Sequence, residues 1–402
     1  MKILVLNSRI YSLEYELLEV PGEKILCSGQ IKRIGAESSV IIHKVEGKDQ
    51  DKIIKPVFDH QKALDAVIKL LTGPQDGVIK DKKEIGAVGH RVVHGGEDFQ
   101  GSIKITPDVR KKIYQNFQLA PLHNPFNLKA IDAALKLLPG VPQVAVFDTS
   151  YYQKMPPSAY YYALPMHISK EHKIRRYGFH GISHQYACEN AANILKKPLK
   201  GLRIISFHLG QGCSVSAIKD GAPIDTSMGF SPLGGLVMTT RCGNIDPEIV
   251  IYLSKLGWSF TEIEVMLNKE SGILGLSGVS DNMKDVILAA EKGDERSKLA
   301  IDIFCYAATK YFFSYYGILG GANAIIFTGG IGVNSPLIRK RILEGAKFLG
   351  IEIDPAKNRK TVACAGRIES KSSKAKILVI PRNEGILIAR ETYKIIKGKK
   401  IG

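Results

Sequence analysis

Residues 202–227 read LRIISFHLGQGCSVSAIKDGAPIDTS and decide the fold of the second half of the chain. This run divides into three short apolar segments, separated by a Gly turn and a Lys-Asp-Gly turn, which predicts a three-stranded meander. Residues 2–29, KILVLNSRIYSLEYELLEVPGEKILCSG, divide in the same way although their letters differ. One pattern therefore opens each half of the chain, and it predicts two related α/β domains facing each other across a cleft.

Alternating strand and helix patterns follow each meander. Buried strands are predicted at residues 85–93, 143–147, 324–328 and 375–380, and helices at 127–138, 336–349 and 386–396. The last helix is expected to pack back on the N-terminal half. We therefore expect a first domain of residues 1–150 plus 385–402 and a second domain of residues 151–384.

Length and composition agree with this two-domain interpretation. The chain has 402 residues, 45% of them hydrophobic and 24% charged, which is typical of a globular protein and excludes disordered and collagenous classes. Lys and Arg exceed Asp and Glu by 56 − 39 = 17 charges. The positive residues are spread in short clusters without an aromatic platform or zinc-finger spacing, so a lysine-rich surface is favoured over nucleic-acid binding.

The six cysteines lie too far apart for a CxxC redox pair or a cysteine-rich zinc site. Reduced thiols in the cytoplasm are the expectation. The apolar run near the N-terminus is too short for a signal peptide, and no stretch is long enough to span a bilayer. We expect neither secretion nor membrane insertion.

Two glycine-rich segments are candidates for phosphate binding. Residues 208–212 (HLGQG) end a predicted strand, and residues 327–334 (FTGGIGVN) join a strand to a helix. Glycines let backbone N–H groups approach a phosphate closely. Each segment alone is better explained as a tight turn, but together in one half of the chain they indicate a nucleotide.

Three cationic motifs could stabilise anions. Arg91 ends the strand in GHRVVHGG (89–96), and RRYGFHG (175–181) and MTTRCGNIDP (238–247) place Arg and His beside glycines. Such cations suit carboxylate binding or the charge that develops in phosphoryl transfer, although a surface ion pair is an equally good reading of Arg91 alone. His90 and His94 lack the spacing of a zinc motif.

Two carboxylates follow predicted strands directly or nearly so. Asp148 ends the strand at 143–147, and Glu384 follows the last strand. Open α/β sheets bind ligands at the carboxyl ends of their strands, so both are candidate site residues. Helix N-capping is an equally good explanation for each of them taken singly.

At these residues the chain resembles the acetate kinase family over essentially its whole length. The motifs that carry the resemblance, in the family's order and spacing, are GHRVVHGG (89–96), PLHNP (121–125), FDTS (147–150), RRYGFHG (175–181), HLGQG (208–212), DTSMGFSPL (225–233), TRCGNIDP (240–247), SGVS (277–280), FTGGIG (327–332) and IPRNE (380–384). The resemblance implies two duplicated ribonuclease H-like domains of the actin-like ATPase type with a nucleotide cleft between them. It also implies a homodimer, Mg²⁺ (or Mn²⁺) as cofactor, and reversible phosphoryl transfer between ATP and acetate or another short carboxylic acid.

The resemblance also implies a role for each matching position. The catalytic residues are Asp148, His180 and Arg241; the acid is bound by Arg91 and His123; the metal is positioned by Asn7 and Glu384; and the nucleotide is held by His208, Leu209, Gly210, Gln211, Gly212, Asn282, Met283, Lys284, Gly330, Ile331, Gly332, Val333 and Asn334. On this basis the first domain would be the acid-binding, dimer-side domain and the second the nucleotide-binding domain. A short carboxylic acid is already ionised at pH 7, so Asp148 need not be a general base; holding the metal or the transferring group suits it better.

The first turn departs from the family's pattern. The family has Gly and Ser there and a Lys shortly after, whereas this chain has Arg9, Ile10 and Tyr11 in the turn and Glu14 at the Lys position. At an effective dielectric constant of ~20, two unit charges ~4 Å apart interact by about 4 kcal/mol, so inverting a phosphate-facing charge is costly unless Arg9 compensates. This departure favours an alternative: a weakened or inactive relative that acts as a nucleotide-binding or interaction protein.

Milder departures occur elsewhere, several of which remove an acid or shorten a nucleotide contact. They are Tyr152, Gln211, Gly234, Asn244, Asn282, Lys284 and Val333, which stand where the family has His, Asn, Glu, Asp, Asp, Arg and Glu.

Overall fold

The protein is described from a computed structural model of the chain, in which residues 1–398 are described. The chain divides into two compact units. The first unit consists of Met1–Gln153 and Asn383–Gly402, and the second is Lys154–Arg382. These boundaries differ from the expected ones by a few residues, so Glu384 falls in the first unit rather than the second.

The first unit is built on a mixed sheet of order β5-β4-β3-β2-β1-β6-β8-β7. Its strands are β1 (Lys2–Arg9), β2 (Ser12–Glu19), β3 (Lys24–Lys32), β4 (Val40–Val45), β5 (Gln50–Ile54), β6 (Ile85–Val92), β7 (Ile103–Lys104) and β8 (Gln143–Phe147). β1, β6 and β8 are parallel neighbours, so their carboxyl ends lie at one edge of the sheet. All three are nearly continuous apolar runs, as expected of strands covered on both faces.

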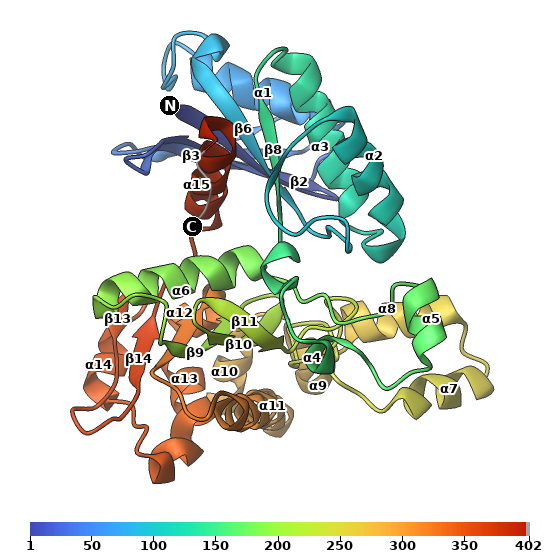
Figure 1. Cartoon of the computed structure of the whole chain (residues 1–402), viewed down its shortest axis with the longest axis vertical. Coiled ribbons are helices and arrows are strands. Elements are labelled where there is room, and N and C mark those ends of the chain that lie inside the picture. Colours follow the sequence, from blue (N-terminus) through green and yellow to red (C-terminus); the bar gives the residue numbers. More distant parts are fainter. Residues whose placement is uncertain (399–402) are drawn as a thin grey trace. The chain divides into compact units, whose positions relative to one another are not determined.

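Helices cover both faces of this sheet (Figure 1). They are α1 (His60–Thr72), α2 (Pro107–Gln115), α3 (Asn124–Leu137) and α15 (Glu384–Lys397), with short 3-10 segments at Lys82–Glu84, Asn116–Leu119 and Ser150–Tyr152. Val88 packs in one core cluster with Ala133 and Ala134 of α3. The next residue, Gly89, faces α15, where a Cβ atom would meet Thr392 Oγ1 at 2.4 Å. The closing helix therefore packs on the first unit, as predicted.

The second unit has a six-stranded sheet of order β11-β10-β9-β12-β14-β13. Its strands are β9 (Arg203–Leu209), β10 (Cys213–Lys219), β11 (Ala222–Thr226), β12 (Ala324–Thr328), β13 (Gly366–Arg367) and β14 (Lys376–Val379). The predicted meander and the two later strands are confirmed.

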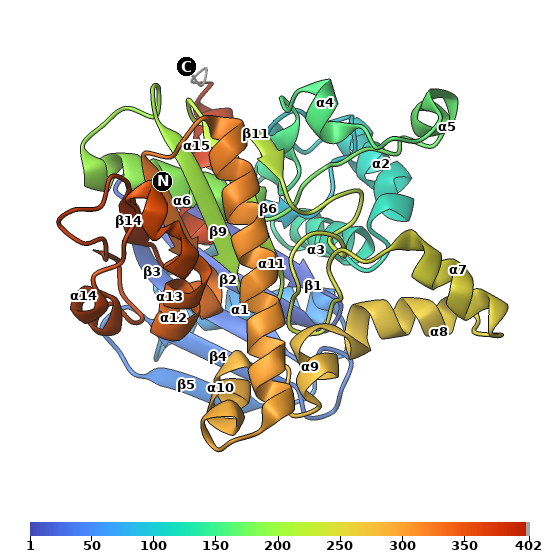
Figure 2. The same cartoon turned by 90° about the horizontal axis from the view of Figure 1, so that it is seen from below.

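The helices of the second unit pack around this sheet, with α11 running along β9 and β10 (Figure 2). They are α4 (Pro157–Tyr160), α5 (Met166–Glu171), α6 (Gly181–Leu195), α7 (Pro247–Lys255), α8 (Phe260–Val265), α9 (Gly272–Ser277), α10 (Met283–Glu291), α11 (Glu295–Leu319), α12 (Gly329–Asn334), α13 (Pro336–Leu343) and α14 (Pro355–Lys360), with a π segment η4 (Met266–Glu270) and a 3-10 segment η5 (Glu344–Leu349). The helix predicted at 336–349 is thus α13 followed by η5.

The two sheets share one plan. In each, an antiparallel meander is extended on the side of its first strand by two parallel strands: β3-β2-β1-β6-β8 in the first unit and β11-β10-β9-β12-β14 in the second. The duplication predicted from residues 2–29 and 202–227 is therefore present in the topology.

Candidate active site

In the first unit, three candidate side chains lie at the carboxyl ends of adjacent parallel strands. Asn7 is near the end of β1, Arg91 near the end of β6, and Asp148 directly follows β8. The backbone N–H of Asp148 donates to the carbonyl of Val92 at 3.0 Å, which continues the sheet ladder one residue past β8. Because β1, β6 and β8 are parallel neighbours, these residues lie at one edge of the sheet.

Arg91 connects the other members of this cluster. Its Nε and Nη2 donate to Oδ2 of Asp148 at 3.1 and 2.5 Å, and its Nη1 donates to Oδ1 of Asn7 at 3.3 Å. Nη1 also lies 3.9 Å from Oε2 of Glu384, the first residue of α15. Arg91, Asn7, Asp148 and Glu384 thus form one polar cluster within the first unit, which we call the Arg91 cluster.

Glu14 also belongs to this cluster. On β2, its Oε2 accepts a hydrogen bond from Nδ2 of Asn7 at 2.8 Å and its Oε1 accepts one from Gln30 at 3.3 Å. Arg9 lies 3.6 Å from Oε1 of Glu14. Glu14, which stands at the family's Lys position, therefore has the nearby cation Arg9, as the sequence suggested. Glu14 also fixes the orientation of the Asn7 amide.

Burial and charge act against each other in the Arg91 cluster. Burial alone disfavours the charged guanidinium of Arg91, but the carboxylates of Asp148 and Glu384 outweigh this and raise its pKa. Burial raises the pKa of Asp148, and the charge of Arg91 opposes that change. Arg91 is thus a fixed cation with carboxylates on two sides.

One oxygen of Asp148 is positioned for a ligand. Oδ1 is buried and has no hydrogen-bond partner, while Oδ2 is occupied by Arg91. Among the residues that the structure describes, no three His, Cys, Asp or Glu side chains come together to hold a metal ion. An all-protein metal cage is therefore absent from residues 1–398. The oxygens of Asn7, Asp148 and Glu384 are nevertheless the hard donors that suit a Mg²⁺ ion held partly by substrate phosphates.

His123 is half-buried at the start of α3. Its neighbours Asn124 and Asn127 have a structural role: their amide oxygens accept hydrogen bonds from the backbone N–H groups of His94 and Val93, both at 3.1 Å. The PLHNP motif therefore fixes the loop after β6, and the role of His123 in acid binding stays a prediction.

In the second unit, His180 and Arg241 meet over Gly212. A Cβ atom at Gly212 would lie 2.9 Å from Nη2 of Arg241 and 3.0 Å from Nε2 of His180. His180 has a left-handed backbone (φ 57°) at the N-terminus of α6, which turns its ring toward β9 and β10. Only a glycine at 212 leaves room for both side chains, so this position has a steric reason for the glycine of HLGQG.

Arg241 is a half-buried cation, and within residues 1–398 it has no acidic partner. Among residues 1–398 no carboxylate forms an ion pair with it, and Nη1 donates to the carbonyl of Pro232 at 2.6 Å. Burial lowers its pKa, yet an arginine stays protonated at neutral pH. A partly desolvated cation of this kind is stabilised by an incoming anion such as a phosphoryl group.

A histidine–serine network supports this site, and sequence reasoning missed it. Nδ1 of His180 contacts Ser214 Oγ at 2.9 Å, and the same Oγ contacts Nε2 of His184 at 2.8 Å. The ring of His180 stacks on His208 with centroids 4.1 Å apart, and His208 in turn contacts Ser183 at 2.8 Å. The spacing of His180, Ser183 and His184 on one turn of α6 was the available signal.

A cavity of about 900 Å³ adjoins the two glycine-rich segments of the second unit. Eight predicted nucleotide residues line it: Gly210, Gln211, Asn282, Met283, Lys284, Gly330, Ile331 and Asn334. His208, Leu209, Gly212, Gly332 and Val333 are not among its lining residues; the side chains of Leu209 and Val333 are buried. This volume is within the usual range for a small-molecule pocket.

Several residues of this cavity were not predicted from the sequence. Thr239, Asp281, Ile287, Leu288, Glu291, Ser335, Pro336, Leu337 and Val362 also line it. Met283, Ile287 and Glu291 follow one another at helical spacing on α10, which the sequence pattern could have shown.

The model of the acetokinase family matches residues 2–390. The chain belongs to the acetokinase family. It is 48% identical over 405 residues to the acetate kinase of Thermotoga maritima, covering all of both chains.

Solved structures agree with this family assignment. The acetate kinase of Porphyromonas gingivalis matches with a TM-score of 0.94 and 39% identity, covering 98% of this chain and 99% of that one. A propionate kinase from Francisella tularensis matches with a TM-score of 0.91 and 41% identity over the same shares. The fold is therefore that of the acetokinases, with two duplicated actin-like domains, as expected. Nothing in these comparisons supports the alternative of a non-catalytic relative.

Among residues 1–398, no helix combines the length and apolar character that crossing a bilayer requires.

Proposed function

We propose that this protein is an acetate kinase, which transfers the terminal phosphoryl group of ATP reversibly to acetate or another short carboxylic acid and forms acetyl phosphate and ADP. The observation that carries the proposal is the full-length family match together with two preserved sets of residues, the Arg91 cluster and the His180–Arg241 pair. Each set has the charge that one part of this reaction needs.

The first unit is proposed to bind the acid. Arg91 presents a guanidinium that stays charged and is held in place by Asp148 and Asn7, so a carboxylate can replace part of this network at little conformational cost. The acid is already an anion at neutral pH, so its oxygen can attack without a general base. Asp148 and Arg91 therefore position groups rather than remove a proton.

The second unit is proposed to bind the nucleotide and to stabilise the transferring group. In phosphoryl transfer the charge is spread over the equatorial oxygens of the phosphoryl group, and fixed donors lower the barrier. Arg241 and His180, pressed together over Gly212, supply such donors. The 900 Å³ cavity beside them is proposed to hold the adenosine part of the nucleotide.

Mg²⁺ is the proposed cofactor, and Mn²⁺ is the alternative ion. When bound, the ion would neutralise phosphate charge and orient the phosphates. Asn7 and Glu384 would hold it together with the unpaired Oδ1 of Asp148.

We also propose that the protein is a cytoplasmic homodimer. The resemblance implies a dimer, and α7 supports it because none of its residues is buried although it carries Ile249, Ile251 and Tyr252. Leu256, Trp258 and Phe260 extend this exposed apolar surface into α8. Apolar surface of this kind is usually covered by a partner. In sedimentation experiments Ile251→Asp should give monomers, and Lys197→Asp, at an exposed position outside this surface, should not. Monomeric wild-type protein would contradict the proposal.

A coupled assay for ADP release tests the catalytic proposal and the choice of acid. ADP should appear only with Mg²⁺ and a short acid together, and acetate, propionate and butyrate should be compared at equal concentrations. No acid-dependent ADP release with any of the three would contradict the proposed function.

A further inference from the structure

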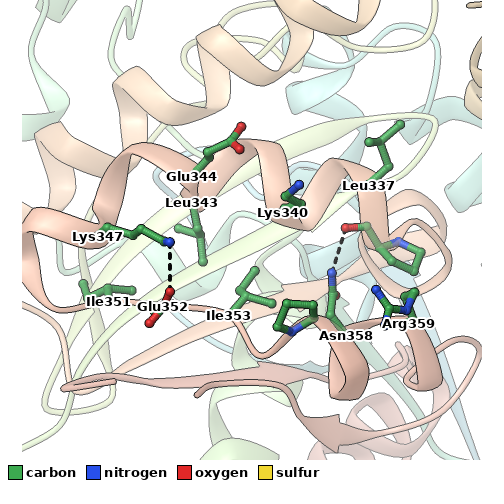
Figure 3. A pocket seen from close by; sticks show the side chains of 12 residues that line it. Leu337, Lys340, Leu343, Glu344, Lys347, Ile351, Glu352, Ile353, Asn358 and Arg359 are labelled. Carbon is green, nitrogen blue, oxygen red and sulfur yellow. Dashed lines mark hydrogen bonds and ion pairs between the residues drawn. The ribbon is translucent and has the colours of Figure 1, made fainter. Parts of the chain in front are cut away.

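A second cavity in the second unit lies outside the site described above. It has a volume of about 460 Å³ and is enclosed by α13, η5, α14 and the segment between η5 and α14 (Figure 3). Leu343 and Ile351 are buried in its apolar floor and Ile353 is half-buried there. This size and this apolar lining are typical of a small-molecule site.

Positive charge at the edge of this cavity is left without a partner. Lys347 pairs with Glu352 at 3.0 Å, so these two charges offset each other. Lys340 and Arg359 also border the cavity, as does the carboxylate of Glu344. Among residues 1–398 the side chains of these three residues form no hydrogen bond or ion pair, so the two cations outnumber the one unpaired carboxylate. An apolar floor beside two available cations suits a ligand with a hydrocarbon body and an anionic head.

The wall of this cavity is connected to the nucleotide loop through one buried arginine. Arg339 is completely buried, and its Nη1 donates to the carbonyls of Gly332 and Val333 in α12, both at 2.8 Å. Its Nε donates to Oδ1 of Asn358 at 2.8 Å, and Asn358 lines the second cavity. The amide of Asn358 also donates to the carbonyl of Pro336 at 2.9 Å (Figure 3).

The two cavities also share lining residues. Pro336 and Leu337, the first turn of α13, border both of them. A ligand that shifts this turn or Asn358 must therefore alter the packing around Gly330 and Ile331, because Arg339 holds α12 and α14 as one polar network. A buried network of this kind has few alternative arrangements, so a displacement on one side is passed on rather than absorbed.

We propose that the second cavity is a regulatory site that binds an amphipathic anion, a carboxylate or phosphate monoester on a short hydrocarbon chain, and that its occupancy changes the affinity of the nucleotide cavity. The binding part of this proposal is independent of the proposed function, and the coupling part rests on the nucleotide site proposed above.

Calorimetric titration of the full-length protein saturated with Mg-ADP tests the binding part, with hexanoate and hexyl phosphate as separate probes. At least one probe should bind once per chain, and the double variant Lys340→Ala/Arg359→Ala should weaken it at least ~10-fold. Lys197→Ala/Lys200→Ala, which removes two exposed positive charges elsewhere in the second unit, should not. Ile353→Glu should also abolish binding. Absence of binding by both probes, or equal binding by both double variants, would overturn the site. The probe that binds more tightly shows whether the site prefers a carboxylate or a phosphate head group.

Linkage tests the coupling part. The dissociation constant of ADP should change at least ~3-fold when the stronger probe is present at saturation, and the probe's dissociation constant should change by the same factor when ADP is present. An unchanged ADP affinity with the probe bound would overturn the coupling while leaving the site in place. Failure of ADP to bind at all would instead count against the proposed function. It would not count against the site, because the probe is also titrated into the protein without ADP.

Discussion

Arg91 and Arg241 carry the same charge in different surroundings, and we expect them to have different roles. Arg91 is already paired with Asp148 and is proposed to bind the ground-state acid. Arg241 has no acidic partner within residues 1–398 and is proposed to meet charge that grows in the transition state. Arg91→Ala should mainly raise KM for acetate, by at least ~10-fold. Arg241→Ala should mainly lower kcat, by ~100-fold or more, about 3 kcal/mol of barrier. Steady-state kinetics measures both, and equal effects of both variants on both parameters would contradict this division.

The first turn provides a second residue-scale prediction. Tyr11 is 69% exposed, while Glu14 accepts a hydrogen bond from Asn7 and lies 3.6 Å from Arg9. The fourfold variant Arg9→Gly, Ile10→Ser, Tyr11→Ser and Glu14→Lys should raise kcat at least ~10-fold, about 1.4 kcal/mol of barrier, because it replaces a repulsive charge near the phosphates by an attractive one.

The single variant Glu14→Lys should gain less than the fourfold variant. It keeps Arg9, so two cations would face each other where a 3.6 Å ion pair now lies. If the fourfold variant is folded and its kcat is unchanged or lower, the turn is adapted to its neighbours and this explanation is wrong.

Some residues of the site could be predicted from the sequence, whereas some of their contacts could not. Arg91 and Asp148 could be singled out because each ends or follows a predicted apolar strand, whereas Asn7 came only from the family resemblance. The contact of Glu14 with Asn7 depends on a hairpin register that places Asn7 opposite Glu14. The burial of Arg339 depends on carbonyl groups of two other helices, α12 and α14. Neither carries a local sequence signal, since an arginine in a helix is ordinarily exposed.

At the scale of elements, the turn from β12 into α12 depends on one glycine. Gly329 has φ 78°, and a Cβ atom there would lie 2.5 Å from the carbonyl oxygen of Leu209. Gly329→Ala should therefore destabilise the second unit by about 2 kcal/mol, lowering its Tm by roughly 4–8 °C. Gly330→Ala is the matched control, because nothing lies within 4 Å of its added Cβ. Calorimetry that finds equal Tm values for the two variants would contradict the steric argument.

Elements were predicted best where a pattern is local. The strands of both meanders and the parallel strands were found from apolar runs between turn residues, and their ends differ by one residue at β6 and β14. Helix ends differ more: α3 begins at Asn124 rather than 127, and α13 gives way to η5 after Leu343. α7 was not predicted, and among residues 1–398 its apolar side chains Ile249, Ile251 and Tyr252 stay exposed.

At the scale of the whole molecule, buried neutral histidines link stability to pH. Burial lowers the pKa of His90 to about 4 and that of His94 to about 3. Unfolded histidines titrate near 6.5, so below that pH the unfolded state binds more protons and the folded state loses stability as pH falls toward 4. The free energy of unfolding should fall by about 2 kcal/mol or more between pH 6 and pH 5. Urea titrations at both pH values measure this free energy. A pH dependence that corresponds to uptake of fewer than one proton on unfolding would contradict the prediction.

The second unit is one continuous segment, whereas the first needs both ends of the chain. A fragment of residues 154–382 should therefore fold cooperatively and bind Mg-ADP, because it contains the complete sheet and the 900 Å³ cavity. Circular dichroism and calorimetric titration test this. A folded fragment without ADP affinity would show that the nucleotide site needs residues of the first unit.

The most direct test of the central claim is product identity. Purified protein incubated with acetate, Mg-ATP and hydroxylamine should form acetyl hydroxamate in proportion to the ADP released, because hydroxylamine captures acetyl phosphate. The signal should disappear without Mg²⁺ and fall sharply in Arg241→Ala. ATP turnover without any hydroxamate from acetate, propionate or butyrate would contradict the claim that these residues transfer a phosphoryl group to a carboxylate.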